Sequence, residues 1–175
     1  MSLPYFNYNE KEGTIYDYAP EYKPVIFIPA DFDCCGELRL LSSQIDFSRI
    51  LKAAFPQFNW QGTGTCLDVG SFYALVTRKS FYEHDNLEDI KIALLFLKER
   101  IQKDGVDKIV MQLPHLVGVK WQEVHDEIFD VFGGDALKMV VTYMKTDRVL
   151  VLADADMEKI NYEKNKDPLL NSRYI

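Results

Sequence analysis

The sequence predicts an α/β fold of three layers, in which a mixed central sheet of about six strands carries helices on both faces. One observation is that residues 72–143 alternate between strand and helix patterns with few interruptions. Another is that the helix patterns place apolar residues at i, i+3 and i+4, so that one face of each helix can pack on a core. Alternating strands and amphipathic helices are typical of a sheet that is covered on both sides.

Short apolar runs, rich in β-branched and aromatic residues, predict the strands. The expected strands span residues 13–18, 24–28, 72–77, 109–113, 137–143 and 148–152. A short Lys-Thr-Asp turn joins the last two, which favours an antiparallel hairpin. Residues 57–70, with their Gly-Thr-Gly-Thr stretch, are expected to form a loop.

Two shorter helices are expected before and after the longest one. Asp46 is placed to cap a helix that continues to Phe55 and stops before a proline. Residues 120–132 carry an apolar stripe that places Trp121 in the core, and two glycines end this helix. Both helices therefore have one apolar face, as a helix that covers a sheet requires.

The longest helix is expected to begin at Leu87. Asp85 and Glu88 are spaced as a capping box, in which the Asp85 side chain accepts from the first free N–H groups of the helix. Gly105 follows the apolar pattern, at the position where a left-handed residue ends a helix. The apolar stripe consists of Leu87, Ile90, Leu94, Leu97 and Ile101.

Length and composition predict one domain over residues 1–175, large enough to bury a substantial core. Residues 1–12 are interpreted as an N-terminal extension and residues 154–175 as a polar C-terminal tail. The net charge of −7 argues against a surface that binds nucleic acid through its phosphates. No apolar run approaches the roughly 18 residues that span a bilayer, so no membrane partner is expected.

The three cysteines are too few, and odd in number, for a disulfide framework. Cys34 and Cys35 are adjacent and lack the C-x-x-C spacing that zinc sites favour, so neither a metal nor another cofactor is expected. The N-terminus has neither the basic nor the apolar region of a secretion signal. A reducing cytoplasm is therefore the predicted location.

Ligands of such folds bind beyond the carboxyl ends of the strands. That rule selects three loops, which span residues 29–43, 79–86 and 114–120. Asp31 and Asp33 lie in the first loop, where they are either solvated charges or groups with a chemical role. His115 follows a strand end, a common place for a general base, although a lone histidine there is more often a structural hydrogen-bonding group.

Several motifs follow one another in a fixed order along the chain. A strand ends with residues 75–79, Leu-Val-Thr-Arg-Lys, and Asn86-Leu87 begin the next helix. The following strand ends at Pro114, and Gly118 and Trp121 lead into the last helix, WQEVHDEIFDVF. This order resembles the C-terminal half of a macro domain, the module that binds ADP-ribose, and especially the small members that remove terminal ADP-ribose.

The resemblance implies that the ligand is ADP-ribose or a related ADP-ribose phosphate nucleotide. It implies ligand contacts from Asp17, Asp31, Gly36, Arg78, Val117, Gly118 and Tyr143. Asp17 stands where the family's aspartate contacts the adenine amino group, with a turn or cap role as the alternative. The backbone at Gly36 and at residues 117–118 would hold the phosphates, and Tyr143 would lie beside the adenosine.

The chain also departs from the family. Arg78 replaces the first lysine of the family's Thr-Lys-Lys, and arginine stays protonated, so the lysine nucleophile of the de-ADP-ribosylating members is not expected. If the protein is an enzyme, we expect an ADP-ribose-phosphate phosphatase or ADP-ribosyl hydrolase in which Asp33 or His115 activates water. Because each ligand loop has few glycines, the alternative is a degenerate macro fold without nucleotide binding, which acts as a protein-interaction module.

Overall fold

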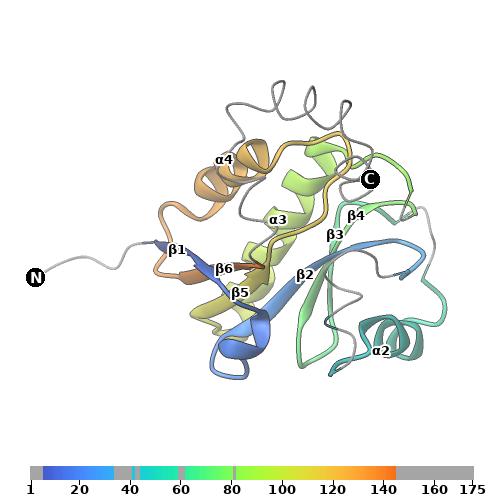
Figure 1. Cartoon of the computed structure of the whole chain (residues 1–175), viewed down its shortest axis with the longest axis horizontal. Coiled ribbons are helices and arrows are strands. Elements are labelled where there is room, and N and C mark those ends of the chain that lie inside the picture. The colour runs from blue at the N-terminus through green and yellow to red at the C-terminus, as the bar shows by residue number, and fades with distance from the viewer. Residues whose placement is uncertain (1–5, 34–40, 42–43, 59–61, 81, 145–175) are drawn as a thin grey trace, which may run out of the picture.

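A six-stranded sheet forms the centre of the molecule, in the order β1-β6-β5-β2-β4-β3 (Figure 1). The structure is a computed structural model that describes residues 6–33, 41, 44–58, 62–80 and 82–144. The strands are β1 (Asn7–Glu12), β2 (Lys23–Pro29), β3 (Thr65–Asp68), β4 (Tyr73–Arg78), β5 (Lys108–Gln112) and β6 (Lys138–Tyr143). All neighbouring strands run parallel except β3, which is antiparallel to β4, so the predicted mixed sheet is confirmed.

Helices cover both faces of this sheet, as predicted. Helices α3 (Leu87–Asp104) and α4 (Trp121–Phe132) contribute to the core on one face, and α2 (Phe47–Ala54) with the short 3₁₀ helix η1 (Ile15–Asp17) contributes to the core on the other. Side chains alternate between these two cores along β2, β4, β5 and β6, because successive residues of a strand point to opposite faces. In β5, for example, Ile109 and Met111 join the first core and Val110 joins the second.

The first strand lies earlier in the chain than predicted. Residues 7–12 form β1 at one edge of the sheet, so most of the expected N-terminal extension belongs to the fold. The strand expected at residues 13–18 is wrong, because Gly13 has a φ of +140° and turns the chain into η1. The Gly13 N–H donates the last ladder hydrogen bond, at 2.9 Å, to the carbonyl of Tyr143.

A second edge strand lies within the segment that was expected to be a loop. Residues Thr65–Asp68 form β3, which pairs with β4 through four residues of each strand. Its side chains are all partly exposed, since β3 borders solvent. A strand so short and so half-buried has no apolar run to distinguish it from a loop.

The helix ends agree with the sequence analysis, and α3 begins at Leu87 as expected, but the residue that caps α3 differs. Asn86 caps α3, because its side-chain oxygen accepts from the N–H groups of Glu88 at 2.8 Å and Asp89 at 3.3 Å. The expected capping role of Asp85 is therefore wrong, and its buried carboxylate has other partners. Gly105 ends α3 with a φ of 69°, as predicted.

Helices α2 and α4 also match the sequence analysis. Asp46 caps α2 by accepting from the Arg49 N–H at 3.1 Å. Trp121 is the first residue of α4 and packs, partly buried, against the core beneath that helix. Both helices therefore begin and end within one or two residues of the expected positions.

The predicted strand at residues 148–152, the C-terminal tail at 154–175 and the Cys34-Cys35-Gly36 segment lie outside the described residues. Strand β6 is hydrogen-bonded on both edges, to β1 and to β5, so it offers no free edge to a hairpin partner. Among the described residues, no helix is long and apolar enough to cross a membrane.

Candidate functional site

The carboxyl ends of the five parallel strands meet at one edge of the sheet, which is where ligands bind in folds of this kind. Two loops at this edge lie largely within the described residues. One follows β4 and leads into α3, and the other follows β5 and leads into α4. The loop after β2 is described only as far as Asp33.

A buried carboxylate joins the two described loops. Asp85 Oδ2 accepts from Arg78 Nη1 at 3.1 Å and from the Val117 N–H at 2.7 Å, and Asp85 Oδ1 accepts from the Thr77 hydroxyl at 2.9 Å. The Asp85 N–H donates to the Val117 carbonyl at 2.8 Å, and Arg78 Nη1 also donates to the His115 carbonyl at 3.2 Å. We call this set of contacts the Asp85 clamp.

The Asp85 clamp is almost closed to water. The side chains of Arg78 and Asp85 are only 4% and 1% exposed. A charge buried this far is tolerated only when it is paired and hydrogen-bonded. The clamp therefore has a clear structural role, which is to hold the β5–α4 loop against the end of β4.

The β5–α4 loop presents Gly118 with a φ of +81°, in the left-handed region that favours glycine. The Val117 N–H is taken by the Asp85 clamp, whereas the Gly118 N–H donates no hydrogen bond within the part of the chain that the structure describes. The His84 ring lies beside Gly118, so that a Cβ atom added there would come within 2.5 Å of His84 Nδ1. At the start of α4, the Lys120 N–H already donates to Glu123 Oε2 at 3.0 Å.

The aspartates that were expected to contact the ligand or activate water are exposed and take part in local hydrogen bonds. Asp17 Oδ2 accepts from the Thr14 N–H at 2.9 Å, which is the turn role weighed against a ligand role. Asp31 Oδ1 accepts from the Asp33 N–H at 3.0 Å, and Asp33 itself is exposed. Gly36 lies outside the described residues. Ligand contacts from these residues stay predictions.

Histidine and tyrosine side chains complete the predicted set. His115 is exposed at the carboxyl edge, three residues after the end of β5, and His84 is exposed on the neighbouring loop. Tyr143 ends β6 and is buried in the core on the α3 and α4 side of the sheet. No group of three or more metal-binding side chains is assembled among the described residues.

Sequence reasoning missed a buried polar pair at the same edge. Thr142 Oγ1 donates to Gln112 Oε1 at 2.9 Å, and both residues are almost fully buried. The Gln112 Nε2 group has no hydrogen-bond partner among the residues that the structure describes. The available signal was a polar residue at the end of each apolar strand run, in KIVMQ and KMVVTY. The same reasoning missed Asp85 as the link between the two loops.

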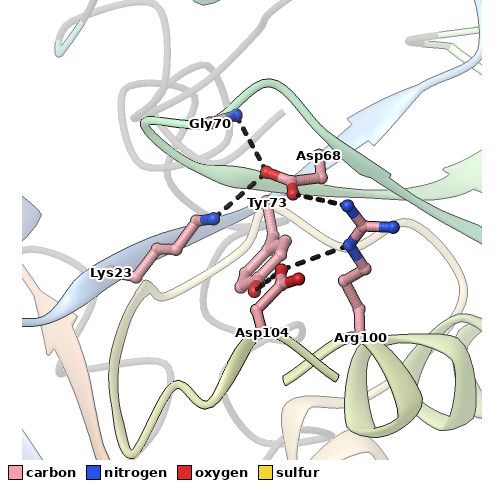
Figure 2. A network of polar contacts seen from close by, with 6 residues as sticks. All are labelled: Lys23, Asp68, Gly70, Tyr73, Arg100 and Asp104. Carbon is pink, nitrogen blue, oxygen red and sulfur yellow. Dashed lines mark hydrogen bonds and ion pairs between the residues drawn. The ribbon is translucent and has the colours of Figure 1, made fainter. Parts of the chain in front are cut away.

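A separate polar network lies at the opposite ends of the parallel strands, next to the amino ends of β2 and β4 (Figure 2). Asp68 accepts from Lys23 at 3.1 Å and from Arg100 at 3.2 Å. Asp104 accepts from Arg100 at 3.2 Å and from the Tyr73 hydroxyl at 2.7 Å, and Lys23 Nζ lies 3.9 Å from the centre of the Tyr73 ring. Each carboxylate here is paired with a cation, so the network connects secondary-structure elements rather than forming a binding site.

Cys66 is the one cysteine within the described residues, and it lies in β3 next to this network. Burial raises the pKa of its thiol to about 12, and the neighbouring Asp68 carboxylate acts in the same direction. A thiol with such a pKa stays protonated at neutral pH, so Cys66 is not an activated nucleophile.

No model of a protein family matches the sequence, and no curated protein matches it. Solved structures do match its fold. The macrodomain of Thermus aquaticus DarG superposes with a TM-score of 0.59 at 16% identity, over 78% of this chain and 98% of that one. The IBV X-domain gives a TM-score of 0.58 at 14% identity, over 85% of this chain and 96% of that one.

A third structure, Thermosipho africanus DarTG in complex with ADP-ribose, gives a TM-score of 0.63 at 11% identity. It covers 80% of this chain and 42% of that one. At identities this low, the likeness concerns the fold and not the activity. The three comparisons show that the chain has the macro-domain fold, as the motifs in residues 72–143 indicated.

Proposed function

We propose that this macro-domain fold binds ADP-ribose, or a related ADP-ribose phosphate nucleotide, over the carboxyl ends of its parallel strands. The observation that carries the proposal is the left-handed Gly118, whose N–H is not hydrogen-bonded within the described residues, in a loop that the Asp85 clamp holds in place. Backbone N–H groups fixed in this way bind phosphate oxygens well, because they need no rearrangement. One structure of the same fold, from Thermosipho africanus, is a complex with ADP-ribose.

We place the phosphates between Gly118 and Gly36, and the adenine near Asp17. One oxygen of Asp17 accepts from Thr14, which leaves its other oxygen for the adenine amino group. Arg78 and Val117 support the site differently from the sequence prediction. Since both donate to Asp85, we assign them to holding the loop rather than to direct contact with phosphate.

The chemistry that we propose excludes a lysyl intermediate at position 78. Arg78 is buried, paired with Asp85 and permanently protonated, so it supplies no free amine. If the protein hydrolyses its ligand as an ADP-ribose-phosphate phosphatase or ADP-ribosyl hydrolase, the exposed Asp33 or His115 would activate the water. A covalent adduct on the exposed Lys79 would contradict this assignment.

A second candidate function is a protein-interaction module that has lost its nucleotide. It is favoured by the start of α4, where the carboxylates of Asp85 and Glu123 already accept from Val117 and Lys120. These acids occupy N–H groups that would otherwise bind phosphate, and their charge repels an anion. The two candidates differ in one measurable property, which is the affinity for ADP-ribose.

Calorimetric titration with ADP-ribose is the direct test. We expect heat of binding with the natural chain and none with Gly118→Val, because a side chain there blocks the approach of phosphate to the backbone. Gly70→Val is the matched control, since Gly70 also has a positive φ, +92°, and a Cβ atom there meets nothing within 4 Å. Circular dichroism and a thermal melt establish that both variants are folded. If millimolar ADP-ribose gives no heat and no thermal shift with the natural chain, the second candidate is correct.

Asp17→Ala tests where the adenine lies. We expect weaker binding of ADP-ribose and ADP, and unchanged binding of ribose 5-phosphate, which has no adenine. Loss of one hydrogen bond to a charged group corresponds to roughly tenfold in affinity or more. An equal loss for all three ligands would mean that Asp17 acts through the Gly13 turn and not through the base.

A further inference from the structure

One edge of the sheet is unpaired within the described residues. Strand β1 pairs with β6 on one side only. The Asn7 and Gly13 N–H groups point toward β6, where they donate to the carbonyls of Leu137 and Tyr143 at 2.8 and 2.9 Å. Alternate residues of a strand direct their backbone groups to opposite edges. The N–H and C=O groups of residues 8, 10 and 12 therefore point outward, as the backbone of a strand does before it accepts a further strand.

An exposed aromatic surface lies directly beside this edge. Phe129 of α4 is 41% exposed, although it is a large apolar side chain. Its ring centre lies 5.1 Å from that of Tyr8, 5.2 Å from that of Phe6 and 4.8 Å from that of His125. Tyr8 belongs to β1, and Phe6 immediately precedes this strand. The aromatic surface and the unpaired edge therefore form one continuous region.

The charged side chains on the α4 side of this region are mostly acidic. Lys11 of β1 lies on the opposite face of the sheet, and Lys98 of α3 donates to the Val131 carbonyl near the end of α4. Glu10 and Glu12 lie two and four residues after Tyr8 in β1. Their side chains are therefore on the same face of the sheet as Tyr8 and α4. Asp126, one helical turn before Phe129, has a side chain that is 67% exposed. Residues 121–132 of α4 contain no lysine or arginine.

We propose that this edge binds an extended, basic segment of a partner protein as an additional strand beside β1. The partner's backbone pairs with residues 8, 10 and 12, and one of its arginine side chains stacks on Phe129. Its other cationic side chains pair with Glu10, Glu12 and Asp126. This interaction is independent of the nucleotide site, because it uses neither the Asp85 clamp nor Gly118.

A second copy of the chain fits the same edge less well. Pairing two β1 strands would bring two acidic α4 helices together, each without a compensating cation between residues 121 and 132. The net charge of −7 on each chain adds to that repulsion. Charge therefore decides in favour of a basic partner.

The test uses a fluorescein-labelled nine-residue peptide in which arginine and valine alternate, followed by fluorescence anisotropy. Glu10→Pro removes an outward N–H group and leaves the bonds to β6 intact, since proline is tolerated on an edge strand. We expect this variant to bind the peptide roughly tenfold more weakly, and Glu10→Gln, which keeps the N–H group, only about twofold more weakly. Phe129→Ala should weaken binding about fivefold. Phe96 on α3 is similarly exposed, and Phe96→Ala should not weaken binding.

Two further measurements separate strand pairing from charge attraction. A peptide that is N-methylated at alternate amides cannot pair with β1, so it should lose binding to the unaltered protein. Hydrogen exchange should slow at the amides of Tyr8, Glu10 and Glu12 when the unmodified peptide binds, and stay unchanged at Asn7 and Gly13.

The proposal is overturned if the methylated and unmethylated peptides bind equally, if Glu10→Pro binds as the natural chain does, or if no binding is detected at millimolar peptide. It is also overturned if sedimentation without peptide shows a dimer that Glu10→Pro dissociates. In that case the edge pairs with a second copy of the chain.

Discussion

The two ends of the β4–α3 unit are both held by carboxylates, but in different surroundings. At the carboxyl end of β4, Arg78 and Asp85 form a pair that is 4% and 1% exposed. At the amino end, the Tyr73 hydroxyl binds Asp104 at the end of α3, and Asp68 of β3 joins the same network through two basic side chains (Figure 2). The charged groups there are 18% to 42% exposed.

A charged contact is irreplaceable at the buried end and replaceable at the partly exposed end. A partly exposed ion pair can exchange its partner for water, so each one contributes little. A buried carboxylate or guanidinium cannot, so removing one partner leaves an unpaired charge in a medium of low dielectric. The candidate ligand loops are attached to the buried end, and they depend on it for their position.

Asp85→Ala should have the largest effect on stability. It leaves the Arg78 guanidinium buried without its carboxylate and leaves the Val117 N–H without an acceptor, so we expect a loss of about 3–5 kcal/mol. Guanidinium denaturation followed by circular dichroism measures it. The double variant Arg78→Met/Asp85→Leu, which buries no charge, should recover most of the loss. If Asp85→Ala costs no more than a change at Asp68, the contrast between the two ends does not exist.

Tyr73→Phe should have an intermediate effect at the opposite end. It removes one hydroxyl that donates to Asp104 at 2.7 Å, and it leaves the buried ring in place. We expect a loss of about 1.5 kcal/mol, typical of a hydrogen bond to a charged group. Because the hydroxyl is neutral, the loss should be nearly the same in 0.1 and 1 M NaCl. A strong dependence on salt would mean that the variant acts by displacing Lys23 from above the ring.

Gly118→Ala tests how rigidly the Asp85 clamp holds the β5–α4 loop. Alanine at a φ of +81° costs about 1 kcal/mol, and its Cβ atom also meets His84 Nδ1. The His84→Ala/Gly118→Ala double variant should remove the part that is due to the contact. Gly70→Ala, at a φ of +92° and with nothing within 4 Å of its added Cβ atom, is the control in the same denaturation assay. If Gly118→Ala leaves the stability unchanged, the loop adjusts freely.

Much of this fold could be predicted from the sequence, because its signals are local. The cap at Asp46, the left-handed Gly105 and the apolar stripes of α3 and α4 lie within one or two helical turns of the residues that they affect. The two edge strands could not be predicted in the same way. Their segments, NYNEKE and TCLD, face solvent along one edge and have no apolar run.

The candidate site was only partly predictable, because its contacts join distant parts of the chain. Asp85 and Val117 are 32 residues apart, and nothing near Asp85 indicates that its side chain turns inward. Asn86 and Asp85 are both good capping residues, so the pattern alone could not tell which of them caps α3. The loop positions followed from the strand order, but the buried partners within them required the structure.

Asp68→Asn should have the smallest effect on stability, and that effect should depend on pH. Burial alone would raise the pKa of the Asp68 carboxyl, but the Gly70 N–H, Lys23 and Arg100 outweigh burial and hold this pKa below that of an ordinary aspartic acid. A carboxyl whose pKa is lowered by folding stabilises the protein above its unfolded pKa, and that contribution is lost as the pH falls through the folded pKa. We therefore expect Asp68→Asn to cost about 0.5 kcal/mol at pH 7, less in 1 M NaCl, and nothing once the pH is well below the folded pKa of Asp68. Urea denaturation of the natural chain and the variant at each pH measures the difference, and a cost that persists in acid would assign the role of Asp68 to packing rather than to charge.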